Sequence, residues 1–246
     1  MAILFKNKND DETTIAHSAV ELVESLVFAI LMALVIKTSI VEAYRIPSGS
    51  MEDTLLVGDF LLANKFVYGM RLPIPFTDIK LPAIVDPKPG DIVIFKYPKD
   101  PSLSYIKRCI AVGGQTVEIV NKQVYVDGEY VEMPPAGKHI DNRIIPIHPG
   151  VDWGSRDNMP KTKVPEGMLF MMGDNRDNSK DSRAWGFLDK RLVMGRALTV
   201  HWSWAPDMNS PKISPDDFFS IIKWIAYNIW HFPQRVRWER LAYIIN

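Results

Sequence analysis

Six short runs of β-branched and aromatic residues, each bounded by turn residues, dominate the chain between residues 91 and 202. Such runs are typical of strands, because branched and aromatic side chains fit a pleated, half-buried surface. Asn121-Lys122 and Asp127-Gly128 each stand where a hairpin would turn. The sequence therefore predicts a mainly β domain. The expected strands cover 91–98, 104–112, 116–120, 123–131, 168–174 and 196–202.

Residues 133–167 interrupt this pattern with a long segment that is rich in proline, glycine and charge. Long connections without a regular apolar pattern usually run over the surface of a domain. We expect this segment to be a surface excursion from the β domain.

An apolar run over 22–41 has about the length needed to cross a bilayer. Its charge-free centre, 25–36, has only 12 residues, because Glu24 and Lys37 lie near its ends. A buried helix or the apolar part of a cleaved signal peptide would have a similar composition.

Two observations argue against a cleaved signal peptide. Acidic residues 10–12 offset the basic residues that such a peptide needs at its start, and no small-x-small cleavage site follows the run. We therefore predict a tail over 1–18, one transmembrane anchor over 19–41, and a single β-rich domain over 42–246.

A second apolar stretch, 218–230, is too short to span a bilayer comfortably and contains Lys223. Trp224, Tyr227 and Trp230 recur at intervals of three residues, and arginines follow them. This composition fits an amphipathic helix over 216–233 that lies in a membrane interface. It fits equally a helix packed on the protein's own sheet.

Charge and motif content exclude several classes of function. Lys+Arg and Asp+Glu both count 29, so no net positive field indicates a nucleic-acid partner. The single cysteine, Cys109, forms no intrachain disulfide or thiolate cluster, and the five histidines are scattered singly. With no metal or nucleotide motif present, we expect no cofactor and no metal.

Two serines flank one glycine in YRIPSGSMEDTLLVGDF, residues 44–60, directly after the apolar run. Such a cluster is most often a solvated linker. Ser48 and Ser50 also supply hydroxyl groups, and a serine hydroxyl becomes a nucleophile when a neighbouring base activates it. The segment is therefore either a linker or part of an active site whose base lies elsewhere.

Lys107 lies in the middle of the expected strand 104–112. Strict alternation places it on the same face as Tyr105 and Cys109. Burial among apolar neighbours disfavours the ammonium form, lowers the pKa of a lysine and makes it a candidate base. Most lysines in strands instead reach solvent, so both interpretations remain open.

The segment GDNRDNSKDSRAWGF, residues 173–187, is strongly polar and would ordinarily be a solvated loop. It does not fit a calcium loop, because Arg176 and Ser179 stand where ligands or glycine are needed. Asp181 and Arg183 could pair and brace a site, and the Ser179 hydroxyl could bond a neighbouring amine.

Three segments now occur in a fixed order behind an apolar run: IPSGSMEDTLLVGDFLLANKF, GDIVIFKYPKDPSLSYIKR and GDNRDNSKDSRAWGF. Together they resemble the type I signal peptidases, the bacterial leader peptidases. The resemblance implies a signal-peptidase-type β domain on one N-terminal transmembrane helix. It also implies a Ser/Lys endopeptidase that removes signal peptides from exported preproteins.

Carried onto this chain, the resemblance makes Ser50 the nucleophile and Lys107 the general base. Ser48 would donate its hydroxyl to the oxyanion beside the backbone N–H of Ser50. Ser179 would hydrogen-bond and orient the lysine amine. The pair Asp181 and Arg183 would hold this loop in place.

The resemblance also implies shallow apolar pockets that admit small side chains one and three residues before the cut, the A-x-A rule. An extended substrate would lie as a strand beside the sheet. The residues expected to form the pocket walls are Ile46, Pro47, Met51, Leu55, Tyr105 and Ile106.

The same resemblance implies a single-pass protein of the bacterial inner membrane, with a cytoplasmic N-terminus and the catalytic domain on the periplasmic side. Expected partners are preprotein signal peptides, membrane lipids and, transiently, the secretion translocon, but no nucleic acid. Asp53 stands where the family commonly has proline, which predicts a looser turn.

Two rival classes remain. Self-cleaving repressors share the Ser/Lys plan, but residues 1–43 are too short and too apolar for their DNA-binding module. A membrane-anchored β domain that binds signal peptides without cutting them is the non-enzymatic alternative.

Overall fold

Two antiparallel sheets account for most of the regular structure in the computed structural model, which describes residues 20–33, 41–69, 83–147, 154–214 and 216–245. The larger sheet has eight strands in the order β1-β2-β11-β3-β4-β9-β10, with β12 paired to β11. In chain order these are β1 (Val41–Arg45), β2 (Asp59–Asn64), β3 (Ile92–Tyr97), β4 (Asp100–Val112), β9 (Met168–Met172), β10 (Leu188–Asp189), β11 (Val193–Ser203) and β12 (Tyr243–Ile244).

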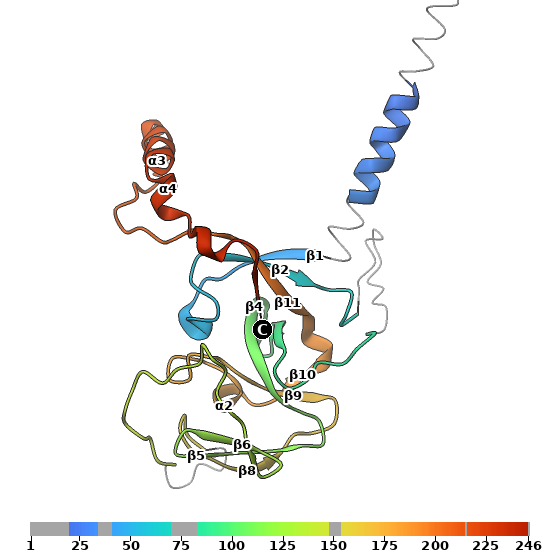
Figure 1. Cartoon of the computed structure of the whole chain (residues 1–246), viewed down its shortest axis with the longest axis vertical. Helices are drawn as coiled ribbons and strands as arrows, with labels where there is room; N and C mark the ends of the chain where they lie inside the picture. The colour runs from blue at the N-terminus through green and yellow to red at the C-terminus, as the bar shows by residue number, and fades with distance from the viewer. Residues whose placement is uncertain (1–19, 34–40, 70–82, 148–153, 215, 246) are drawn as a thin grey trace, which may run out of the picture.

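The smaller sheet has four strands in the order β7-β6-β5-β8 and lies at the bottom of the view in Figure 1. The chain enters it directly from the end of β4. Its strands are β5 (Thr116–Val120), β6 (Gln123–Val126), β7 (Glu129–Tyr130) and β8 (Met159–Lys163). The fold is therefore mainly β, as predicted.

All six expected strands are present, and the predicted hairpin turns explain how β5, β6 and β7 follow one another. Asn121 and Lys122 have φ of 49° and 72°, and Asp127 and Gly128 have φ of 53° and 89°. Two consecutive positive φ angles are typical of the tight turns whose twist matches that of paired strands. Local turn chemistry thus sets the register of the smaller sheet.

Part of the expected surface excursion, 133–167, is instead integrated into the smaller sheet, so that prediction was wrong for this part. Strand β8 pairs with β5, and Met159 at its start and Val164 directly after its end are buried. Pro160 is tolerated because β8 is an edge strand of this sheet. The sequence did not predict β8 because it is polar, and it is polar because the middle residues of this strand face away from the core.

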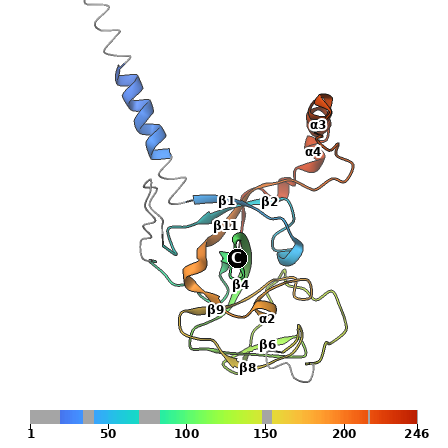
Figure 2. The ribbon, with the colours of Figure 1, turned by 180° about the vertical axis from the view of Figure 1, so that it is seen from behind.

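Short helices and turns connect the strands, and one longer helix lies near the C-terminus. They are η1 (Gly49–Met51), α2 (Ser182–Trp185), η2 (Lys190–Leu192), α3 (Phe218–Trp230), α4 (Phe232–Arg235) and η3 (Trp238–Arg240). Residues 20–33 form a further helix, which Figure 2 shows projecting away from the sheets.

Among the described residues, no helix combines the length and the apolar character that a membrane crossing requires. The expected anchor, 19–41, is described only over 20–33 and at Val41, and the remainder lies outside the described residues. The expected tail, 1–18, lies wholly outside them.

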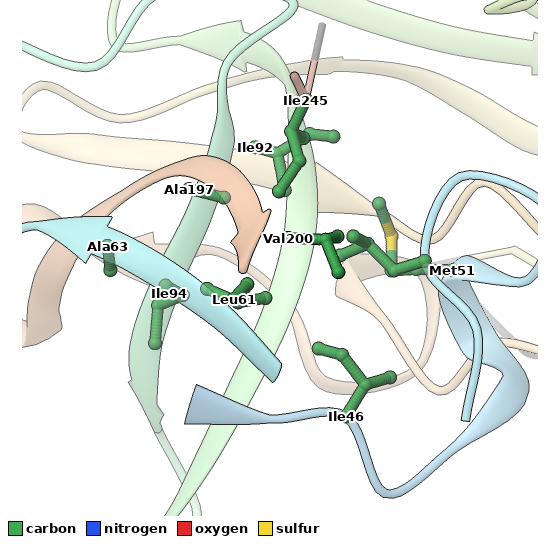
Figure 3. Close-up of a cluster of buried hydrophobic side chains, with 10 residues drawn as sticks. Ile46, Met51, Leu61, Ala63, Ile92, Ile94, Ala197, Val200 and Ile245 are labelled. Atoms are coloured by element: carbon green, nitrogen blue, oxygen red, sulfur yellow. The ribbon is translucent and has the colours of Figure 1, made fainter. Parts of the chain in front are cut away.

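Strand β4 runs through the core and contributes to each of three clusters of buried side chains. Ile106 packs on the first cluster, Cys109 belongs to the second and Ile110 to the third. Figure 3 shows Met51, Ile46 and Val200 among the side chains of the first cluster. The middle of β4 is thereby held beside the segment that carries Met51.

Candidate active site

Ser50 lies in η1, the single turn that follows β1. Its neighbour Met51 is fully buried in the first core cluster, as is Ile46 four residues before Ser50. Two apolar side chains inserted in the core on either side of Ser50 fix the turn in place. Ser50 itself is only 8% exposed.

Lys107 reaches Ser50 from the middle of β4. Its Nζ atom lies 2.6 Å from Ser50 Oγ, and it also donates to the carbonyl of Ile106 at 2.9 Å. The residue is 4% exposed. The predicted lysine and the predicted serine, 57 residues apart in the chain, are therefore in direct contact.

Burial lowers the pKa of Lys107 to about 8 from its usual 10.5, because the charged ammonium loses its hydration. Asp181 and Asp174 act in the opposite direction. Both acids pair with arginines, Asp181 with Arg183 and Asp174 with Arg108, which reduces their hold on the lysine. With a pKa of about 8, about a tenth of Lys107 is neutral at pH 7, and a general base must be in its neutral form.

Asp174 joins the two segments that carry the reactive groups. It is fully buried and accepts two hydrogen bonds of 2.9 Å from Arg108, the residue after Lys107. It also accepts from the Thr54 hydroxyl at 2.6 Å, four residues after Ser50. One carboxylate thus ties β4 to the serine segment, with the charge satisfied on both sides.

The residues on either side of Asp174 also contact the serine turn. The backbone N–H of Asn175 donates to the Ser50 carbonyl at 3.2 Å, and its side chain donates to the Gly49 carbonyl. At Gly173 an added Cβ would come within 2.5 Å of the Ser50 carbonyl and 2.3 Å of Ser179 Oγ. Only glycine permits this close approach.

Asp181 and Arg183 form the predicted pair. Arg183 donates twice to Asp181 from its guanidinium, at 2.9 and 2.7 Å, and also donates to the Arg176 carbonyl. Burial would raise the pKa of Asp181, but the Arg183 charge and hydrogen bonds hold it below its usual range. Asp181 also caps α2, so the pair stabilises the loop that carries Gly173.

Ser179 lies in the site but does not make the expected bond to Lys107. The lysine amine donates to Ser50 and to Ile106, whereas the buried Ser179 hydroxyl lies near Asp181 and helps to lower the pKa of that carboxyl. Because Ser179 Oγ stands beside the Gly173 and Ser50 backbones, its hydroxyl remains close to the reactive serine.

A cavity of about 360 Å³ opens in front of the Ser50–Lys107 contact. Ser48 borders it, with its Oγ atom 3.5 Å from Ser50 Oγ. Of the six residues expected as pocket walls, Pro47, Tyr105 and Ile106 line this cavity. The cavity is also lined by Gly49, Ser104, Asn178 and Lys180.

The other three expected wall residues, Ile46, Met51 and Leu55, do not line this cavity but belong to the first core cluster. They support the serine turn from behind. Their role in binding substrate stays a prediction.

Asp53 has φ of 75°, a left-handed conformation that proline cannot adopt. The turn therefore differs in form from one built on proline, and the expected loosening stays a prediction. Lys138 bridges it by ion pairs with Asp53 at 2.9 Å and Glu52 at 3.1 Å.

Sequence reasoning missed Asp174, Asn175, Gly173 and Thr54 as parts of this site. All four stand inside the quoted motif segments, beside residues that were singled out. The feature that could have identified them is the run of consecutive polar residues and glycine in which each stands, between apolar segments. The pairing of Asp174 with Arg108, 66 residues away, could not be read from it.

Comparisons with known proteins give one consistent family. The family model described as "Signal peptidase, peptidase S26" matches residues 19–202. The chain is 37% identical to the signal peptidase I of Pseudomonas aeruginosa over 228 residues, covering 79% of this chain and 75% of that protein. It is 33% identical to the signal peptidase I of Aquifex aeolicus over 239 residues, covering 78% and 86%.

A crystal structure of a signal peptidase I from Enterococcus faecalis V583 is 28% identical and covers 46% of this chain and 98% of that one. Its TM-score is 0.35, and the family assignment does not rest on it.

Proposed function

Since the chain belongs to the signal peptidase family, peptidase S26, and is an enzyme of the signal peptidase I type, we propose that Ser50 and Lys107 carry its reaction. The reaction is cleavage of N-terminal signal peptides from exported preproteins after an A-x-A-like site. The observation that carries this proposal is the 2.6 Å contact between the buried Lys107 amine and the Ser50 hydroxyl.

The acylation step follows from that contact. Neutral Lys107 takes the proton of Ser50 as the hydroxyl oxygen attacks the scissile carbonyl carbon. The lysine then passes this proton to the leaving amine, and the peptide bond breaks to give an acyl-enzyme. A water molecule, deprotonated by the same lysine, hydrolyses the ester and restores Ser50.

The oxyanion formed in each step needs hydrogen-bond donors that are already in place. The Ser48 hydroxyl borders the same cavity as Ser50, which supports it as one donor. The backbone N–H of Ser50 supplies the second. Ser179 and the pair Asp181–Arg183 act as positioning residues, because they hold the loop whose backbone contacts Ser50.

An extended substrate fits the edge of β4 over 104–106, where no described strand pairs on one side. Residues 104–106 pair with β3 on one side, whereas pairing of β4 with β9 begins only at Arg108. The open side of 104–106 borders the cavity, so a peptide can add there as a strand with alternate side chains directed into it. Tyr105, Ile106 and Pro47 limit the room for those side chains, which favours small residues such as alanine.

The proposed location is the bacterial inner membrane. The segment 19–41 serves as a single anchor, with the tail 1–18 in the cytoplasm and the domain 42–246 on the outer face. The active site then lies close to the bilayer where signal peptides emerge, and transient contact with the secretion translocon follows from this location. The apolar composition of 22–41 supports the anchor.

The test is cleavage of a purified preprotein with an A-x-A site by the detergent-solubilised full chain, beside a Ser50→Ala variant. Mass spectrometry should map a single cut after the second small residue, and the variant should lose it while melting at the parental temperature. A well-folded parental chain that leaves several preproteins intact in the presence of lipid would favour a binding protein instead.

A further inference from the structure

Helix α3 turns its apolar side chains outward. It lies beyond the residues that the family model matches, 19–202. Large apolar residues at seven of its positions are exposed, with Trp230 at 81% and Ile229 at 71%. The seven are Phe219, Ile221, Ile222, Trp224, Ile225, Ile229 and Trp230.

The inward side of the same helix is polar. Among the described side chains of α3, Ser220 and Asn228 are buried. The Ser220 hydroxyl exchanges hydrogen bonds with Ser214, and Asn228 accepts from Arg235. Tyr227 is half-buried and donates to Asp207 at 2.8 Å. A helix that packs on its own domain buries its apolar face. In α3 the apolar face is exposed and the polar face is buried, so the alternative of a helix packed on the sheet is wrong.

The exposed face has the composition of a membrane-interface helix. Its apolar residues stand beside two tryptophans, which prefer the headgroup region of a bilayer. Lys223 is the one charged residue within α3, and its long side chain can reach the headgroups. At 13 residues the helix is about 20 Å long, too short to cross the hydrocarbon core.

The position of α3 in the molecule agrees with this chemistry. Figures 1 and 2 show α3 and the helix over 20–33 projecting from the same end of the molecule, with the four-stranded sheet at the opposite end. The apolar side chains of 20–33 are also exposed, including Leu22 at 70%. One flat surface can therefore receive both helices.

We propose that α3 lies in the interfacial layer of a phospholipid bilayer and forms a second membrane contact of the enzyme. The apolar face enters the layer, while Ser220 and Asn228 hold the helix to the domain. Two separate contacts fix the orientation of a body on a surface, which a single point of attachment does not. The lipid surface is that of the proposed location, but the contact itself does not depend on Ser50 or Lys107.

The test uses the full chain in vesicles of phosphatidylcholine and phosphatidylglycerol, with a fluorescent probe on an Ile225→Cys variant. Cys109 is fully buried and stays unlabelled in the folded protein. A Tyr130→Cys variant is the control, because Tyr130 is 55% exposed on β7 in the smaller sheet. Quenchers are lipids that carry a nitroxide either near the headgroup or near the end of the acyl chain.

The proposal predicts loss of most of the fluorescence at position 225 with the shallow nitroxide, a smaller loss with the deep one, and none at position 130. Full fluorescence at position 225 with both nitroxides would overturn it. A second result would also overturn it: unlabelled Ile225→Cys chains that readily form a disulfide with each other, while position 225 is shielded from the lipid quenchers. A second copy of the chain would then cover the apolar face of α3. Cleavage measured in the same vesicles reports separately on the proposed function.

Discussion

Lys107 and Arg108 are adjacent buried cations on β4, yet they belong to two differently built regions of the molecule. Arg108 lies in an ion-paired brace, where it makes two 2.9 Å hydrogen bonds to Asp174 and one of 2.8 Å to the Gly90 carbonyl. Lys107 lies in the contact with Ser50, where its amine bonds a hydroxyl and a carbonyl but no carboxylate of the described residues.

The difference shows how one strand supports both structure and chemistry. Burial removes water from both side chains, which disfavours their charged forms. At Arg108 the Asp174 carboxylate compensates this loss with two hydrogen bonds, and the pair links two segments. At Lys107 nothing compensates it fully, and the pKa falls to about 8. The uncompensated position costs stability and holds the lysine that we propose as the base.

The largest expected effect is on catalysis at the uncompensated position. Lys107→Met should lower kcat/KM by about 10²–10⁴-fold, the usual contribution of a general base, because the Ser50 proton then has no acceptor. Initial rates with an A-x-A preprotein measure this. Lys180→Met is the matched control, since Lys180 lines the same cavity without touching Ser50, and it should stay within several-fold of the parent.

Equal losses in the two variants would mean that the cavity needs positive charge rather than a base at Lys107.

The next effect is on stability at the compensated position. Arg108→Met should lower the free energy of unfolding by about 3–5 kcal/mol, because it leaves the buried Asp174 charge without its partner. Chemical denaturation measures the loss. Adding Asp174→Asn to this variant should restore part of it by removing the stranded charge. A loss below about 1 kcal/mol would show that Arg108 does not brace the site.

A variant at Ser48 tests stabilisation of the oxyanion without changing the base that is proposed to activate the nucleophile. Ser48→Ala should lower kcat by about 10²–10³-fold with little change in KM, which is typical for loss of one oxyanion donor. The pH dependence of the residual activity should match that of the parent, because Lys107 is intact. A change confined to KM would assign Ser48 to substrate binding instead.

The smallest expected effect is a gain in stability when the uncompensated charge is removed. The pKa of Lys107 is lower in the folded chain than in the unfolded one, so folding at neutral pH bears the cost of a buried ammonium group. Lys107→Met should raise the free energy of unfolding at pH 7 by up to about 3 kcal/mol.

This advantage should be constant below pH 8 and should vanish as the pH rises from about 8 to about 10.5, where the unfolded lysine also becomes neutral. Denaturation curves at both ends of this window measure it. A variant less stable than the parent at pH 7 would contradict the cost assigned to Lys107 and would remove the contrast with Arg108.

The parts of the fold that follow from local chemistry were predictable from the sequence. The turns at Asn121-Lys122 and Asp127-Gly128 need residues that tolerate positive φ, and they occur where expected. Strand β8 was missed because its sequence is polar at an edge, where one face meets solvent. Its assignment depends on pairing with β5, which a local pattern does not encode.

The site also has contacts that the sequence predicted and contacts that it did not. The expected contact between Ser50 and Lys107 and the pair Asp181–Arg183 are both formed. The bond from Ser179 to Lys107 is not, since the lysine amine turns to Ser50 and to its neighbouring carbonyl. Asp174 was missed, because its role depends on an arginine and a threonine that only the folded chain brings near.

In the proposed mechanism neutral Lys107 activates Ser50, which the pH dependence of kcat/KM for cleavage of one preprotein tests. We expect kcat/KM to rise with pH through an apparent pKa of about 8 and then to level off, because only the unprotonated amine accepts the serine proton. A profile already level from about pH 6, or a midpoint near the histidine value of about 6.5, would contradict it.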